Sequence, residues 1–142
     1  MTETGILNRD IAAEMSKLGH TDMMLIADAG LAIPSATRVI DISLKRNEPD
    51  ALTVLDEVLK HFSVEKIIYS QETSNVSPTR ETEFLKRFSE DVVVEVVQHE
   101  VLRDDLTYKV KFAIRTGDFT ANSNIVLVSA SGSRWYCENK RQ

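Results

Sequence analysis

The 142-residue sequence lacks most features that mark specialised classes of protein. A single cysteine, Cys137, excludes a disulfide framework and a cysteine-based metal cluster, and it favours a reducing compartment. No apolar run is long enough to span a bilayer, and the first residues lack the basic-then-apolar pattern of a signal peptide. Five glycines and three prolines are the only strong chain breakers, and no low-complexity linker divides the sequence. We therefore expect one cytoplasmic domain covering residues 1–142, with no membrane segment.

Charge and short motifs exclude further classes. The chain has 17 basic and 22 acidic residues, a formal net charge of −5, and its basic pairs Lys45-Arg46 and Lys140-Arg141 are isolated. Without a basic stripe to neutralise phosphates, we expect no nucleic-acid partner. The three histidines lack the spacing of a helical metal site, and the sequence has no dinucleotide fingerprint, phosphate loop or nucleophile elbow. The sequence therefore predicts no metal and no cofactor.

Apolar segments of strand length alternate with amphipathic segments along the chain. The expected helices begin after Asn8, near Asp50, at Pro78 and near Glu100. The expected strands cover residues 23–27, 66–70, 92–97, 109–114 and 125–128. This alternation predicts a three-layer α/β/α fold with a mainly parallel central sheet.

Ligands of open α/β sheets bind beyond the carboxyl ends of the strands, which directs attention to particular polar residues. Asp28 and His99 each follow a predicted strand, and the polar loop 117–124 precedes another. His20 lies between a helix and a strand, where a histidine can also cap the last helical carbonyls. Asp28 is also suited to bonding loop amides, and the asparagines of the loop are ordinary turn formers. His61, near the end of a helix, is interpreted as a surface residue.

Four segments in combination are far more specific than any one of them. They are Leu18-Gly19-His20-Thr21-Asp22, Asp28-Ala29-Gly30-Leu31-Ala32-Ile33-Pro34, His99-Glu100 and Ile114-Arg115-Thr116-Gly117-Asp118-Phe119-Thr120. On these motifs the chain resembles the D-ribose pyranase and fucose mutarotase family over roughly residues 5–129. Asp28-Ala29-Gly30-Leu31, followed by Ile33-Pro34, favours the ribose branch.

The resemblance implies an isomerase that interconverts the pyranose and furanose forms of D-ribose or a related free monosaccharide. His20 matches the family's proton donor, and Asp28, His99 and Asn122-Ser123-Asn124 match residues that contact the sugar. A histidine suits this work because it titrates near neutral pH and can deliver or remove a proton. The resemblance also implies a homo-oligomer, commonly a decamer of two pentameric rings, with active sites between subunits.

This chain departs from the family pattern at three places, one of which is Ala32, where relatives usually have proline. Ala121 and Asn122 stand where relatives usually have proline and tyrosine, so we expect a roomier and more polar pocket. The residues from Ser131 onward replace a usually short C-terminus that ends in an aromatic residue. Two alternatives therefore stand beside the leading hypothesis: a mutarotase for another sugar such as fucose, and a non-catalytic sugar-binding homologue. Retention of His20, Asp28 and His99 favours an enzyme.

Overall fold

The computed structural model describes residues 1–131, 136, 138 and 139, and Cys137 and Lys140-Arg141 lie outside the described residues. The helices are α1 (Arg9–Ser16), α2 (Ala51–Leu59), α3 (Gln71–Val76), α4 (Pro78–Leu85), α5 (His99–Val101), the π-helical η1 (Leu102–Leu106) and α6 (Thr107–Lys109). The strands are β1 (Met23–Ala27), β2 (Val39–Asp41), β3 (Val64–Ser70), β4 (Val93–Val97), β5 (Phe112–Arg115) and β6 (Ile125–Ser129).

Helices α1, α2 and α4 begin where the sequence predicts, and in α1 and α2 a side chain satisfies one of the first free amides. The Asn8 side chain accepts a hydrogen bond from the Ile11 amide at 3.0 Å, and the Asp50 side chain accepts one from the Thr53 amide at 2.8 Å. Pro78 is the first residue of α4, where its missing N–H costs nothing. The stretch expected near Glu100 begins one residue earlier and continues through α5, η1 and α6.

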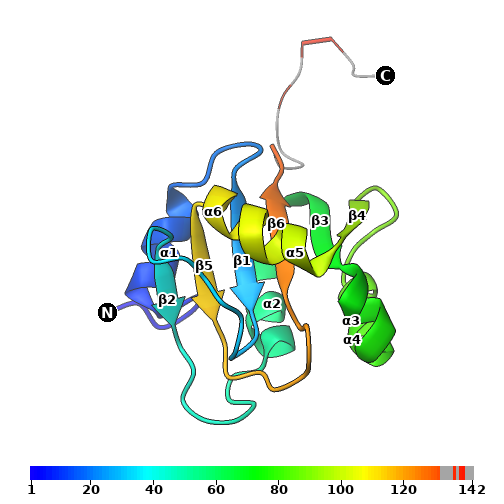
Figure 1. The fold of residues 1–142 in the computed structure, drawn as a ribbon. Coiled ribbons are helices and arrows are strands. Elements are labelled where there is room, and N and C mark those ends of the chain that lie inside the picture. The colour runs from blue at the N-terminus through cyan, green and yellow to red at the C-terminus, as the bar shows by residue number, and fades with distance from the viewer. Residues whose placement is uncertain (132–135, 137, 140–142) are drawn as a thin grey trace.

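The six strands form one sheet in the order β2-β5-β1-β6-β3-β4. Strand β5 pairs in parallel with β1 and β2, and β3 pairs in parallel with β4. Strand β6 is antiparallel to both of its neighbours, β1 and β3. Five strands therefore run in one direction and β6 runs in the other, which confirms the mainly parallel sheet (Figure 1).

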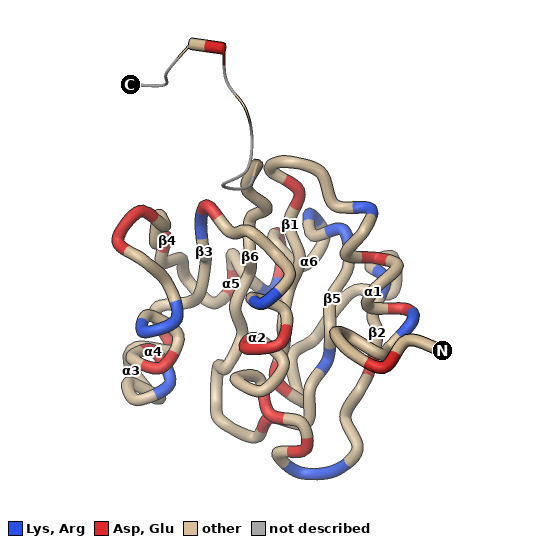
Figure 2. The backbone as a smooth tube through the Cα atoms, turned by 180° about the vertical axis from the view of Figure 1, so that it is seen from behind, with Lys and Arg blue, Asp and Glu red and all other residues tan. Residues whose placement is uncertain are grey.

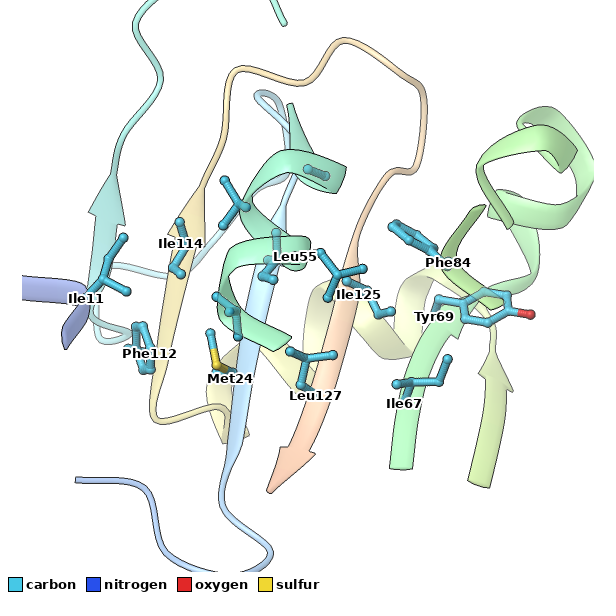
Figure 3. Close-up of a cluster of buried hydrophobic side chains, with 14 of the residues drawn as sticks. Ile11, Met24, Leu55, Ile67, Tyr69, Phe84, Phe112, Ile114, Ile125 and Leu127 are labelled. Atoms are coloured by element: carbon cyan, nitrogen blue, oxygen red, sulfur yellow. The ribbon is translucent and has the colours of Figure 1, made fainter. Parts of the chain in front are cut away.

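Alternate residues of the central strands enter two separate hydrophobic clusters, as the two-residue period of a strand requires. Met24 and Ile26 of β1 belong to the cluster under α1, α2 and α4, which Figure 3 shows together with Leu55 and Phe84. Leu25 and Ala27 of β1 belong to the second cluster, on the face of the sheet that the stretch from α5 to α6 covers. Helices thus cover both faces of the sheet, and the predicted three layers are confirmed.

Some elements differ from the expectation. Strand β2 and helix α3 were not predicted, and the strand expected over residues 109–114 begins only at Phe112. Val110 ends the preceding helical stretch and is buried in the second cluster. Strand β4 lies at the edge of the sheet, so its valines keep surface to solvent, with Val93 58% exposed.

Charged residues of both signs are interspersed over the described backbone, without a stripe of one sign (Figure 2). Within the described residues, every helix is too short or too polar to cross a membrane.

Candidate active site

A cavity of about 640 Å³ lies beyond the carboxyl ends of the five strands that run in the same direction. We call this side of the sheet its carboxyl edge. Asp28 follows β1 and His99 opens α5 after β4, and both line the cavity. Asn122 and Asn124 line it as well, because β6 runs the opposite way and therefore begins at this edge. The structure thus brings together four of the six residues that the sequence singled out.

Asp28 and Asn124 hold each other through reciprocal hydrogen bonds. The Asp28 amide donates to Asn124 Oδ1 at 2.8 Å, and Asn124 Nδ2 donates to Asp28 Oδ2 at 3.2 Å. Asp28 Oδ1 accepts from the amides of Gly30 and Leu31 at 3.1 and 2.9 Å. A carboxylate has about four acceptor positions, so these three bonds fix the group and leave acceptor capacity on Oδ2 for a ligand hydroxyl.

Asp118 organises the loop between β5 and β6 from a fully buried position. Its Oδ1 accepts from the Thr120 amide at 2.7 Å, and its Oδ2 accepts from the Ala51 amide at 2.8 Å and from the Ser123 hydroxyl at 3.3 Å. The guanidinium of Arg80 lies 3.2 Å from the same Oδ2 and compensates the buried charge. Ser123 therefore has a structural contact inside the loop, and it does not line the cavity.

The other wall of the cavity carries the imidazole of His99 and the guanidinium of Arg103. His99 Nδ1 is buried and has no hydrogen-bond partner among the described residues. Arg103, one helical turn further along, also lines the cavity and forms two hydrogen bonds to Asp104, at 2.8 and 2.9 Å. Those hydrogen bonds hold the pKa of the Asp104 carboxyl below its usual value. Arg103, Asp118 and the aromatic Phe119 are cavity residues that the sequence reasoning did not select.

Asn122 has a backbone φ of +57°, a left-handed conformation that asparagine adopts more readily than most residues. Its carbonyl accepts a hydrogen bond from the Thr73 hydroxyl of α3 at 2.7 Å. Phe119, 61% exposed at the cavity, has the Arg46 guanidinium 5.2 Å from its ring centroid. The loop therefore offers an amide and an aromatic ring to the cavity.

His20 lies at the opposite end of the strands, where β1 begins. It precedes β1, whereas Asp28 follows it, and five residues of strand span about 16 Å. Its Nε2 is 3.1 Å from Glu65 Oε2, near the start of β3, and its side chain is 49% exposed. The loop that contains His20 and the loop that contains Asn122 are at opposite ends of the sheet in Figure 1. Within one chain, His20 therefore does not reach the cavity.

Together, the fold and the cavity define a small α/β protein with a polar cavity lined by a fixed carboxylate, an imidazole and side-chain amides. Residues 1–131 match the model of the RbsD / FucU transport protein family, and the chain belongs to that family.

Individual relatives are similar over nearly the whole chain. The D-ribose pyranase of Streptococcus uberis is 45% identical over 129 residues, which cover 91% of this chain and 97% of that protein. The structure of Bacillus subtilis RbsD complexed with D-ribose has a TM-score of 0.87 and 35% identity, covering 93% of this chain and 99% of that one. The fucose mutarotase of Streptococcus pneumoniae, in complex with L-fucose, has a TM-score of 0.72 at 16% identity and is similar in fold.

Proposed function

We propose that this chain is a cytoplasmic isomerase that interconverts the pyranose and furanose forms of D-ribose, without a metal or a cofactor. The observation that carries the proposal is the cavity lined by Asp28, His99 and Asn124, in a chain 45% identical to a D-ribose pyranase. The fold also matches that of Bacillus subtilis RbsD complexed with D-ribose.

The chemistry requires one proton to be delivered and one to be removed. As the ring oxygen receives a proton, the anomeric hydroxyl loses its own, and the bond between the anomeric carbon and the ring oxygen breaks to give the open aldehyde. A different hydroxyl then attacks the aldehyde carbon and closes the other ring, losing its proton while the aldehyde oxygen receives one and becomes the new anomeric hydroxyl. Asp28 Oδ2 can accept a hydrogen bond from one sugar hydroxyl. His99 Nδ1 can form a hydrogen bond with another, since that nitrogen has no partner among the described residues.

We assign proton transfer to His20 from a neighbouring copy of the chain. A general acid must lie within hydrogen-bond reach of the atom it protonates, and the length of β1 prevents this within one subunit. A ring-shaped homo-oligomer, such as a decamer of two pentamers, would bring the His20 edge of one subunit to the cavity of the next. The outward exposure of the His20 and Glu65 side chains, 49% and 41%, suits a contact of this kind.

The function is tested by exchange NMR on free sugars, with D-ribose, L-fucose, D-xylose and L-arabinose measured with and without protein. Faster pyranose–furanose exchange of D-ribose is the expected result. Acceleration of L-fucose alone would select the second candidate, a mutarotase for another sugar, which Asn122 in the cavity favours because it offers an amide. Binding without acceleration would leave only a sugar-binding protein, and neither binding nor acceleration would refute the function.

The shared site is tested by mixing two inactive variants, His20→Ala and Asp28→Asn. Each alone should lose about 10²-fold or more in exchange rate. If one subunit supplies His20 and the next supplies Asp28, random co-assembly restores about a quarter of the sites. His61→Ala is the matched control, because that histidine is on the surface after α2. No recovery in co-assembled mixtures, or a monomeric wild type that is fully active, would refute the shared site.

A further inference from the structure

Helices α3 and α4 hold the middle of the cavity loop by side-chain contacts. The hydroxyl of Thr73 donates to the Asn122 carbonyl and the hydroxyl of Ser77 donates to the Ala121 carbonyl, both at 2.7 Å. Arg80 Nη2 donates to the Thr120 hydroxyl at 3.1 Å. Three consecutive loop residues are thus each bound by a side chain from one short segment, residues 73–80.

Arg80 differs from the other two because it connects two parts of the loop. Its Nη2 donates a hydrogen bond to the Thr120 hydroxyl, while its Nη1 lies 3.2 Å from Asp118 Oδ2 in an ion pair without hydrogen-bond geometry. The Arg80 side chain is 12% exposed and that of Asp118 is fully buried, so this ion pair is not a surface contact. A planar guanidinium can donate a hydrogen bond from one nitrogen while another nitrogen stays beside a carboxylate, whereas an ammonium is a point charge on a single nitrogen.

The loop needs such external support. Residues 118–124 contain no proline or glycine, and Asn122 is held at φ +57°, a conformation that an unsupported chain occupies rarely. The residues bound by Thr73, Ser77 and Arg80 are also cavity residues, since Thr120, Ala121 and Asn122 all line it. Thr73 and Ser77 do not line the cavity themselves. The position of the loop wall is therefore set from behind.

We propose that Arg80 is a positioning residue for the sugar site, holding loop residues 120–122 at the distance from Asp28 that sugar binding requires. This role rests on the proposed function, because it assumes that the sugar occupies this cavity. The loop contacts the sugar in the ground state and in the transition state alike, and the transferred protons are handled by other residues. Its displacement therefore weakens binding more than it slows the chemical step.

The test compares Arg80→Met with Arg87→Met. Arg87 also belongs to the α4 region and also forms partly buried ion pairs, but with Asp56 and Glu83, away from the cavity. For Arg80→Met we expect the KM for D-ribose exchange to rise about tenfold while kcat changes less than about threefold. For Arg87→Met both constants should stay at the wild-type value. Arg80→Lys keeps the charge opposite Asp118 and should recover part of the lost affinity.

The outcomes separate this role from the function itself. Wild-type protein that neither binds D-ribose nor accelerates its exchange overturns the proposed function, and the role of Arg80 with it. An active wild type whose folded Arg80→Met variant keeps the wild-type KM overturns the positioning role alone. If Arg80→Met does not fold, Arg80→Lys decides: a KM raised about threefold supports the role, and a KM equal to that of Arg87→Lys refutes it.

Discussion

Asn124→Asp exchanges one amide nitrogen for an oxygen and places two carboxylates against each other in the cavity. Asn124 Nδ2 lies 3.2 Å from Asp28 Oδ2, and Asn124 is only 2% exposed. At this distance, with an effective dielectric constant of about 20, two unit charges repel by about 5 kcal/mol. The bond from the Asp28 amide survives, because aspartate keeps the accepting oxygen.

The variant can avoid this repulsion by keeping a proton between the two carboxylates. Holding one carboxyl protonated above its ordinary pKa of about 3.9 costs about 1.4 kcal/mol per pH unit, hence about 1.5 kcal/mol at pH 5 and about 4 kcal/mol at pH 7. The pair has a raised pKa in the folded state, so the folded protein binds more protons than the unfolded chain between these pH values. Its stability must therefore fall as the pH rises through this window.

The assay is thermal unfolding at pH 5 and pH 7, in which about 3 °C per kcal/mol converts these costs to losses in Tm of about 5 and 12 °C. Asn122→Asp is the matched control, since it adds the same charge to the same loop at a residue whose backbone, not its side chain, is hydrogen bonded. That control should stay close to the wild-type Tm at both pH values. Equal Tm values for the two variants at pH 7 would show that the Asp28–Asn124 pair does not form.

Two further predictions concern the core and the loop. Phe84→Ala should lower the free energy of unfolding by about 3–5 kcal/mol, measured by denaturant titration, because Phe84 is fully buried with its ring centroid 6.4 Å from that of Tyr69. Leu85→Ala, at a residue 39% exposed, should cost much less, and an equal loss would contradict the assigned packing. Ala121→Pro combined with Asn122→Tyr should change the affinity for D-ribose and the ranking of sugars, measured by calorimetry, at a stability cost of about 1 kcal/mol for tyrosine at positive φ. Unchanged affinities would mean that the loop does not face the sugar.

The sequence predicts those parts of the fold that local patterns encode. Apolar runs and helix caps located β1 and the starts of α1, α2 and α4 correctly. Helix α3 has no apolar periodicity, and β2 is only three residues long, so neither produces a recognisable pattern. Their positions depend on partners distant in sequence, such as the parallel pairing of β2 with β5.

The residues of β6 also do not indicate whether the strand runs parallel or antiparallel to its neighbours. A parallel crossover needs about a dozen residues or more and usually contains a helix, whereas only residues 116–124 join β5 to β6. The short connection is therefore a usable signal for the reversed strand. That reversal is also the reason why a loop preceding a strand reaches the same edge as Asp28 and His99.

The candidate site also contains residues that the sequence predicts and residues that it does not. Their positions directly after predicted strands make Asp28 and His99 candidates from the sequence pattern, whereas Asn124 becomes a candidate through the family resemblance. Arg80 escapes such reasoning, since an arginine on an amphipathic helix resembles any surface charge until its buried partner Asp118 is known. The separation of His20 from Asp28 could be read from their order around β1, and the structure makes its consequence explicit.

The central place of β6 affects how this protein can be made. In the sheet order, β2, β5 and β1 form one half and β3 and β4 form the other, and only β6 joins the two halves. Among the strands of the described residues, β6 is the last to leave the ribosome, although both of its faces are buried. The halves therefore stay unjoined during synthesis, and the sheet and its cavity are completed together in a late step that depends on residues 125–129.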